Sequence, residues 1–256
     1  MKRKILLLAT TVMLSTGLSA QFQVGLKGGY ALGAAQSPIG VSVDGDQTTS
    51  IYGTNGQGIP FGVEFRYLFG DHFGLQLDAT YLLGSELTNF EVLDAGWEQS
   101  TVTKTSQFRI APTLVFKTDL GIYSRFGVLI PLAGQTVATT KNANGGGLAI
   151  PSQVDVTING KFGLGFVGAL GYELTLGNIG IFGELEYIGL AVKRASTEIT
   201  KYEFGGVDQI DNLTDEQKNT SYEDVTTSTG MMAQGTSSAF NSIGLNIGVR
   251  FNIGSN

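Results

Sequence analysis

Residues 21–33 read QFQVGLKGGYALG, and apolar side chains alternate with glycine or polar residues along most of the stretch. Phe22, Leu26 and Tyr30 lie at alternate positions along the stretch, and Lys27 lies at one of the positions in between. We call these two sets of alternate positions the apolar and the polar parity of the segment. A period of two residues is typical of a β-strand, because successive side chains point to opposite faces of the sheet. The stretch therefore predicts a strand with one apolar face and one face of small and polar residues.

Seven further segments repeat this alternation. They are Ile59–Phe69, Phe73–Leu83, Phe108–Phe116, Ile122–Ile130, Phe162–Tyr172, Ile179–Tyr187 and Ile243–Phe251. Short connections, such as residues 70–72, alternate strictly with long ones, such as residues 192–238. This order is typical of transmembrane β-barrels, in which short periplasmic turns alternate with long extracellular loops.

A soluble β-sandwich would also alternate, and three features favour the barrel. The polar parity is rich in glycine, of which the chain has 37, and small residues suit a narrow lumen. The apolar parity carries no Asp, Glu, Lys or Arg, as a lipid-facing surface requires. Aromatic residues such as Phe73 and Tyr81 are spaced to reach both edges of an apolar band about 25 Å tall. We expect an all-β fold, namely a transmembrane antiparallel up-and-down β-barrel of eight strands with short periplasmic turns and long extracellular loops.

The first twenty residues have the three parts of a secretory signal peptide. Lys2, Arg3 and Lys4 precede an apolar stretch over residues 5–13, and small and polar residues follow as far as Ala20. We expect residues 1–20 to be cleaved and residues 21–256 to form a single barrel domain.

Composition and charge exclude several classes of function. The chain has no Cys and one His, which excludes disulfide scaffolds, Cys-ligated zinc and thiol catalysis. Removal of residues 1–20 leaves 13 basic and 22 acidic residues, a net charge of −9. We therefore expect no nucleic-acid partner.

The last predicted strand resembles the assembly signal of bacterial outer-membrane proteins. The residues that carry the resemblance are Ser242, Gly244, Ile247, Val249 and Phe251. The chain as a whole resembles the small eight-stranded outer-membrane β-barrel family of Gram-negative bacteria, of the OmpA, OmpX and OmpW transmembrane-domain type. The resemblance implies a place in the outer membrane, contact with its lipid and lipopolysaccharide, and recognition of these five residues by the barrel-assembly machinery. It also implies a monomer, and it identifies no extracellular partner.

Eleven charged residues fall on the polar parity and are expected to face the lumen. They are Lys27, Arg66, Arg109, Arg125, Lys161 and Arg250, together with Glu64, Asp78, Glu173, Glu184 and Glu186. Because the interior of an eight-stranded barrel is barely wider than its side chains, we expect ion pairs that plug it. The alternative is a narrow gated pore whose lining selects ions.

Two prolines lie inside predicted strands. Pro112 and Pro131 cannot donate to a strand ladder, and a closed barrel has no free edge to hold them. We expect bulges or early strand ends at both positions.

Catalytic and metal sites have weak support. The only histidine, His72, falls in a short turn on the expected periplasmic side, so no Ser-His-Asp constellation forms at the outer rim. We expect no catalytic residue and no cofactor. Asp208, Asp211, Asp215 and Glu216 form either a solvated loop or a weak calcium site that bridges lipopolysaccharide. Residues 214–217 could cap a short helix there.

The sequence thus predicts a non-enzymatic outer-membrane barrel with a structural or surface-recognition role. A narrow porin-like channel for ions or small or hydrophobic solutes is the alternative, and an outer-membrane enzyme ranks third.

Overall fold

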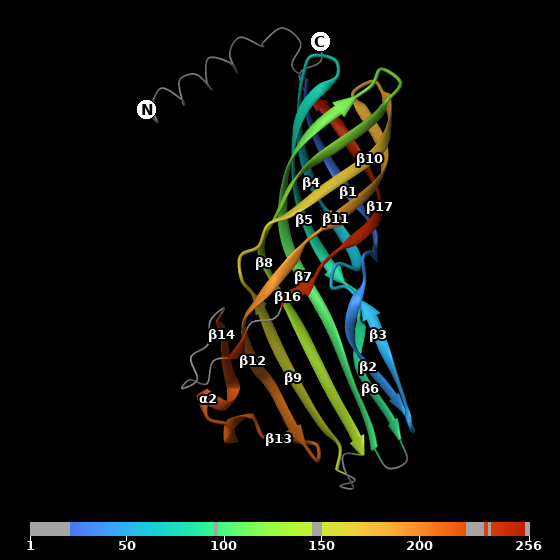
Figure 1. Ribbon diagram of the computed structural model, residues 1–256. Coiled ribbons are helices and arrows are strands. Elements are labelled where there is room, and N and C mark those ends of the chain that lie inside the picture. Colours follow the sequence, from blue (N-terminus) through green and yellow to red (C-terminus); the bar gives the residue numbers. More distant parts are fainter. Residues whose placement is uncertain (1–20, 95–96, 145–149, 224–232, 235–236, 254–256) are drawn as a thin grey trace.

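Eight strands of the chain close into an antiparallel barrel (Figure 1). The computed structural model describes residues 21–94, 97–144, 150–223, 233–234 and 237–253, and the expected signal peptide lies outside them. The barrel strands, in order around the wall, are β1 (Gln21–Gly33), β4 (Gly58–Phe69), β5 (Phe73–Gly84), β7 (Trp97–Lys117), β8 (Ile122–Asn144), β10 (Gly165–Leu176), β11 (Ile179–Gly189) and β17 (Ser242–Ile253). β17 pairs with both β11 and β1, which closes the barrel. The predicted fold class is confirmed, and so are the eight segments, except that the sixth begins at Gly165 and not at Phe162.

The chain enters and leaves the barrel at the same end. Phe22 at the start of β1 pairs with Ile253 at the end of β17. The short connections over residues 70–72, 118–121 and 177–178 join neighbouring strands at this end (Figure 1). We call it the turn end of the barrel.

The barrel is apolar on the outside and charged on the inside. Leu26, Leu114 and Leu245 point outward and keep more than half of their surface exposed, at 55 %, 65 % and 64 %. Arg66 and Arg250 point inward and are fully buried. This arrangement reverses that of a soluble protein and is the one that a lipid environment requires.

The long connections between the barrel strands are not irregular loops, because these segments fold into a second β-structure beyond the barrel. Its strands are β2 (Ser37–Asp44), β3 (Gln47–Gly53), β6 (Leu87–Asp94), β9 (Ser152–Gly160), β12 (Ala191–Phe204), β13 (Val207–Asp208), β14 (Asn219–Glu223), β15 (Ala233–Gln234) and β16 (Ser237–Ala239). They continue the barrel wall in the order β3, β2, β6, β7, β8, β9, β12 and β14. We call this region, with the distal halves of β7 and β8, the extension. Figure 1 shows it as a continuation of the barrel away from the turn end.

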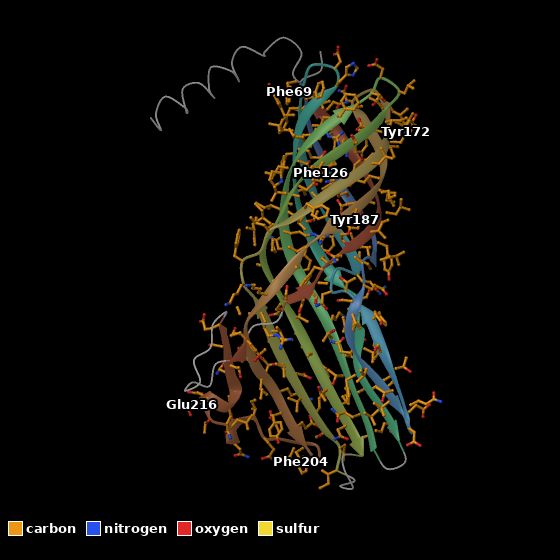
Figure 2. The ribbon with its side chains drawn as sticks, in the orientation of Figure 1. Phe69, Phe126, Tyr172, Tyr187, Phe204 and Glu216 are labelled. Carbon is orange, nitrogen blue, oxygen red and sulfur yellow. The ribbon has the colours of Figure 1, made fainter. Side chains whose placement is uncertain are left out.

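β7 and β8 tie the extension to the barrel. They are 21 and 23 residues long, about twice the 9–11 residues that a transmembrane strand needs. In Figure 2, Phe69 and Tyr172 lie near the turn end, whereas Phe204 and Glu216 lie in the extension. The two regions therefore share one continuous sheet and are not joined by flexible linkers.

The two prolines behave differently. Phe108 of β7 pairs with Ala133, but the next residue, Arg109, pairs with Pro131, so Leu132 forms a bulge. The bulge expected at Pro131 is confirmed. The expectation is wrong for Pro112, which stays in register opposite Leu77 of β5. Proline removes only one donor, and the paired strand tolerates that loss without a shift.

The only helices among the described residues are two short ones, η1 (Ile210–Asn212) and α2 (Asp215–Lys218). The Thr214 hydroxyl accepts a hydrogen bond from the backbone N–H of Gln217, and the Gln217 side chain accepts one from the backbone of Thr214. The predicted helix cap is confirmed. No helix in the described part of the chain is long and apolar enough to span a bilayer.

Candidate functional site

Ten of the eleven charged residues expected in the lumen lie inside the barrel. They are Lys27, Glu64, Arg66, Asp78, Arg109, Arg125, Glu173, Glu184, Glu186 and Arg250, and each is at most 7 % exposed. Five of them are basic and five acidic, so the buried charge is balanced. Lys161 is the exception, because β9 ends at Gly160 and β10 begins only at Gly165. Lys161 is therefore half-buried in the connection between these strands and outside the cluster.

The layer near the turn end is built around Arg250. Its Nε and Nη2 donate to the two carboxylate oxygens of Glu64, and its Nη1 lies 2.6 Å from Oε2 of Glu173. Arg66 donates to the same Glu173 oxygen from 3.2 Å. Lys117, at the rim of the barrel, contacts the other oxygen of Glu173 at 2.8 Å. Three cations thus share two carboxylates in this layer.

The second layer is built around Arg125. Its Nη1 lies 2.8 Å from Oδ2 of Asp78, and its Nη2 lies 2.6 Å from Oε1 of Glu184 and also contacts Glu186. Lys27 contacts the same three carboxylates at 3.3–3.4 Å. Here two cations face three carboxylates. The excess negative charge of this layer therefore offsets the excess positive charge of the layer near the turn end.

Neutral side chains join the two layers. Gln76 accepts a hydrogen bond from Nε of Arg66 at 2.7 Å and donates to Glu64 and Asp78 at 3.1 and 2.7 Å. The Tyr123 hydroxyl donates to Glu184 at 3.0 Å. The Tyr123 ring also lies under the guanidinium groups of Arg66 and Arg250, 4.7 and 4.8 Å from their central carbons. The result is one continuous network of buried charges. Removal of one charged side chain would leave its partner buried and unpaired, which is strongly destabilising.

The sequence prediction missed Gln76, Tyr123 and Lys117. Gln76 and Tyr123 share the inward parity of the charged residues, and this parity is the signal that could have found them. Lys117 has the inward parity of Arg109, but it lies one residue beyond the predicted segment, which ends at Phe116.

Arg109 is held differently from the other inward-facing cations. It is 1 % exposed and donates from Nε to the Thr80 hydroxyl at 3.3 Å. None of the ion pairs found among the described residues involves it, and its Nη1 has no hydrogen-bond partner. Arg109 pairs with Pro131 beside the β8 bulge, so it lies where the barrel meets the extension.

The structure does not gather a calcium site from Asp208, Asp211, Asp215 and Glu216. Asp208 accepts a hydrogen bond from the backbone N–H of Ile210, and Asp215 and Glu216 lie in the first turn of α2. Within the described ranges, no group of three or more His, Cys, Asp or Glu side chains could hold a metal ion.

His72 lies at the turn end and contacts two groups of the neighbouring turn. Its Nδ1 is 3.1 Å from the backbone oxygen of Lys117 and 4.0 Å from Oδ1 of Asp119. The histidine is therefore at the opposite end of the barrel from the extension.

The five residues that resemble an assembly signal all lie on β17. Ser242 and Gly244 point inward, whereas Ile247 and Phe251 are exposed on the outer face beside Val249. They line the seam at which β17 pairs with β1.

A closed eight-stranded barrel with an apolar exterior and an ionic interior defines the architecture of the small outer-membrane barrels. Solved structures with a similar fold include the outer membrane protein OprG from Pseudomonas aeruginosa, with 13 % identity, coverage of 93 % of this chain and 97 % of that chain, and a TM-score of 0.47. Neisserial surface protein A (NspA) has 13 % identity, coverage of 92 % and 99 %, and a TM-score of 0.33. Acinetobacter baumannii CarO2 has 13 % identity, coverage of 90 % and 99 %, and a TM-score of 0.37. No family model and no curated protein matches the chain.

Proposed function

We propose that the protein is a non-enzymatic outer-membrane barrel whose lumen is plugged by the ionic network and whose extension serves in surface recognition. The continuity of the network supports the plug. Every inward-facing carboxylate of the two layers contacts at least one cation, from Glu173 near the rim to Glu186. Ions that cross the lumen would have to break several buried charge pairs, which is unfavourable.

The extension supports the recognition role. Its side chains at the tip, such as Phe204 and Val207, are exposed, and β7 and β8 hold it at a fixed position relative to the barrel. In the membrane, the signal peptide would direct export, the barrel-assembly machinery would read β17, and lipid and lipopolysaccharide would surround the wall of a monomeric barrel. The turn end would then face the periplasm and the extension the outside.

Single-channel recording tests the plug. The wild-type barrel in a planar lipid bilayer is expected to be silent, because no open path crosses the two layers. Arg125→Ala and Arg66→Ala each remove a cation from one layer and are expected to produce measurable conductance. Lys104→Ala is the matched control, since Lys104 is exposed in the extension and its ion pair within the described part of the chain is with Glu86, at 3.7 Å.

A narrow channel is the second candidate, and Arg109 favours it. A buried guanidinium with an unpartnered Nη1 could line an anion-selective path. Steady conductance of the wild-type barrel would support this candidate and contradict the plug. Unchanged silence of both Arg→Ala variants, with heat-modifiable gel migration as proof of folding, would also contradict the plug.

A further inference from the structure

β3 forms one margin of the extension and has a paired neighbour on one side only. Its seven residues, Gln47–Gly53, pair with β2, and no pairing between the described strands places another strand on the other side. Figure 1 shows β3 at the margin of the extension away from β12 and β14. The backbone N–H and C=O groups of β3 that point away from β2 are therefore available to a further strand.

This edge lacks the features that usually protect an exposed strand edge. Residues 47–53 read QTTSIYG and contain no charged residue and no proline. The irregularity of the hairpin lies on β2, where Ile39 is the extra residue, so β3 itself carries no bulge. Residues 47–50 and Tyr52 are exposed. An uncharged and exposed edge of this kind is a template for pairing with another chain.

The opposite margin of the extension is different. β14 pairs with β12 over residues 219–221, and β13 pairs with the end of β12. β14 pairs in turn with β15, and η1 and α2 lie between β13 and β14 in the chain. The edge of β12 is therefore interrupted and partly paired, whereas that of β3 is continuous.

The charges at the tip of the β2–β3 hairpin decide how a second copy of the chain can approach. Asp44 and Asp46 flank Gly45 at the tip and are exposed, whereas β3 is neutral. In a parallel pair of two β3 strands, four carboxylates would meet at one end, which is unfavourable. In an antiparallel pair the two tips lie at opposite ends, about 20 Å apart at ~3.4 Å per residue. This separation exceeds the screening length of about 8 Å at physiological salt.

An antiparallel pair of β3 strands also matches the side chains. When Ser50 lies opposite Ser50 of the second copy, Thr48 lies opposite Tyr52 and Thr49 lies opposite Ile51. Cross-strand pairs of aromatic and β-branched residues stabilise antiparallel sheets. Tyr52 is 58 % exposed, so a second strand would cover surface that is open to solvent.

The direction of β3 fixes the orientation of the paired copies. β3 leads through residues 54–57 into the barrel strand β4, and both run from the extension toward the turn end (Figure 1). An antiparallel pair of β3 strands therefore points the two barrels in opposite directions. Barrels of one membrane share the same direction, because the turn end of each faces the same side. The second copy consequently belongs to another membrane, whose outer surface faces the first.

We propose that β3 pairs antiparallel with β3 of a second copy in an opposed membrane, so that the extension joins two outer-membrane surfaces. The proposal rests on the surface role proposed above and names the partner. Seven residues per copy are fewer than the roughly 20–30 residues a side of a stable interface. A single pair is therefore weak, and many pairs between two surfaces act together. Within one membrane the barrel remains a monomer.

Pairing of nanodiscs tests the proposal. The mature protein is placed in phosphatidylcholine nanodiscs at one barrel per disc, which leaves the extension accessible, and the fraction of paired discs is measured by sedimentation velocity. Concentrations of about 100 µM are used, since a small interface binds weakly. The wild type is expected to pair. Ser50→Lys alone and Ser50→Glu alone are each expected to reduce the paired fraction at least about tenfold, because like charges then face each other. An equal mixture of the two variants is expected to restore pairing.

Thr88 gives the matched control. It is exposed on β6, which has β2 on one side and β7 on the other. Thr88→Lys and Thr88→Glu are expected to leave the paired fraction within about twofold, as a surface change away from an interface does. Ser50→Cys gives a second measurement, because the chain has no other cysteine. Residues that face each other in an antiparallel pair are about 4.5–5.5 Å apart at Cα, within reach of a disulfide. Oxidation is therefore expected to trap a covalent dimer across two discs.

Four results would overturn the pairing. They are single discs for the wild type, undiminished pairing of Ser50→Lys, failure of the mixture to restore pairing, and paired discs that lie side by side in electron micrographs and not face to face. Heat-modifiable gel migration verifies that each variant is folded. Single wild-type discs would contradict the second copy as partner and leave the plug unaffected. Conductance of the same samples tests the plug separately, so the two failures can be told apart.

Discussion

The two halves of β7 follow one alternation in two different surroundings. In the barrel half, the outward-facing Leu114 is 65 % exposed and the inward-facing Arg109 is buried. In the extension half, the inward-facing positions carry threonines, and Thr101 and Thr105 hydrogen-bond to Thr140 and Thr136 of β8 at 2.9 and 2.8 Å. The barrel therefore relies on buried charge pairs and an apolar exterior, whereas the extension relies on cross-strand contacts between neutral polar groups. The same type of substitution should have very different consequences in the two regions.

The largest difference is expected for charge neutralisation. Glu184→Gln leaves Arg125 and Lys27 with one carboxylate fewer inside the barrel, and loss of one member of a buried pair destabilises by about 3–5 kcal/mol. Glu203→Gln breaks the exposed pair with Lys201 in the extension, which contributes about 0–1 kcal/mol. Urea unfolding in phospholipid vesicles measures both. Equal losses would show that the interior network does not set the stability of the barrel.

A new outward-facing charge should also separate the regions. Leu26 lies midway along the outer face of β1, so Leu26→Arg is expected to destabilise the barrel by about 2–4 kcal/mol, as a basic residue near the bilayer midplane does. Val207→Arg places the same charge on an exposed tip residue of the extension, where a surface change is within about 0.5 kcal/mol. Folding yield into vesicles is the second measurement. Tolerance of Leu26→Arg would contradict a lipid-facing wall.

Glycine in the lumen gives an intermediate effect. A Cβ added at Gly62 would lie 2.1 Å from the backbone oxygen of Ala79 and 2.8 Å from Cα of Thr80. Since backbone cannot move aside easily, Gly62→Ala is expected to destabilise by about 1–3 kcal/mol. Gly183→Ala is the control, because the nearest heavy atom there is 3.9 Å away. Similar urea midpoints for the two variants would show that lumen crowding does not require glycine at residue 62.

The smallest effect is expected in the extension. Thr101→Val removes the hydrogen bond to Thr140 and keeps the shape of the side chain, so we expect a loss of about 0.2–1 kcal/mol. Hydrogen exchange of the β7–β8 amides can resolve a change of this size within the extension. A loss that also lowered the stability of the barrel would show that the two regions unfold as one unit.

The barrel was predictable because lipid on one side and a crowded lumen on the other require different residues. Each strand therefore shows a strong contrast between apolar outward-facing residues and small or polar inward-facing residues. That contrast identified the eight segments, and it identified ten of the charges that point inward. The extension was not predicted, because water reaches much of both its faces and no apolar stripe marks its strands. Its signal was β-propensity alone, in threonine- and valine-rich stretches such as residues 101–105, 136–140 and 154–158.

The sequence predicted which charged residues lie in the lumen, but it did not predict which of them form ion pairs with one another. Parity placed Arg125 and Glu184 in the lumen, but nothing in their spacing shows that they lie 2.6 Å apart across the barrel. Parity also failed where the strands are irregular. The bulge at Leu132 shifts the inward-facing positions of β8 from odd to even numbers, and the interruption before Gly165 removes Lys161 from the lumen.

The sequence by itself determined the segments of the barrel strands, their order, and which face of each strand is apolar. Alternation with a period of two residues is a local property of the sequence and does not depend on tertiary contacts. Only the tertiary structure decided which charges pair, and that Arg109 belongs to none of the ion pairs found among the described residues. These features depend on the register between strands and on where a bulge interrupts it, and both are set by contacts between segments far apart in the chain.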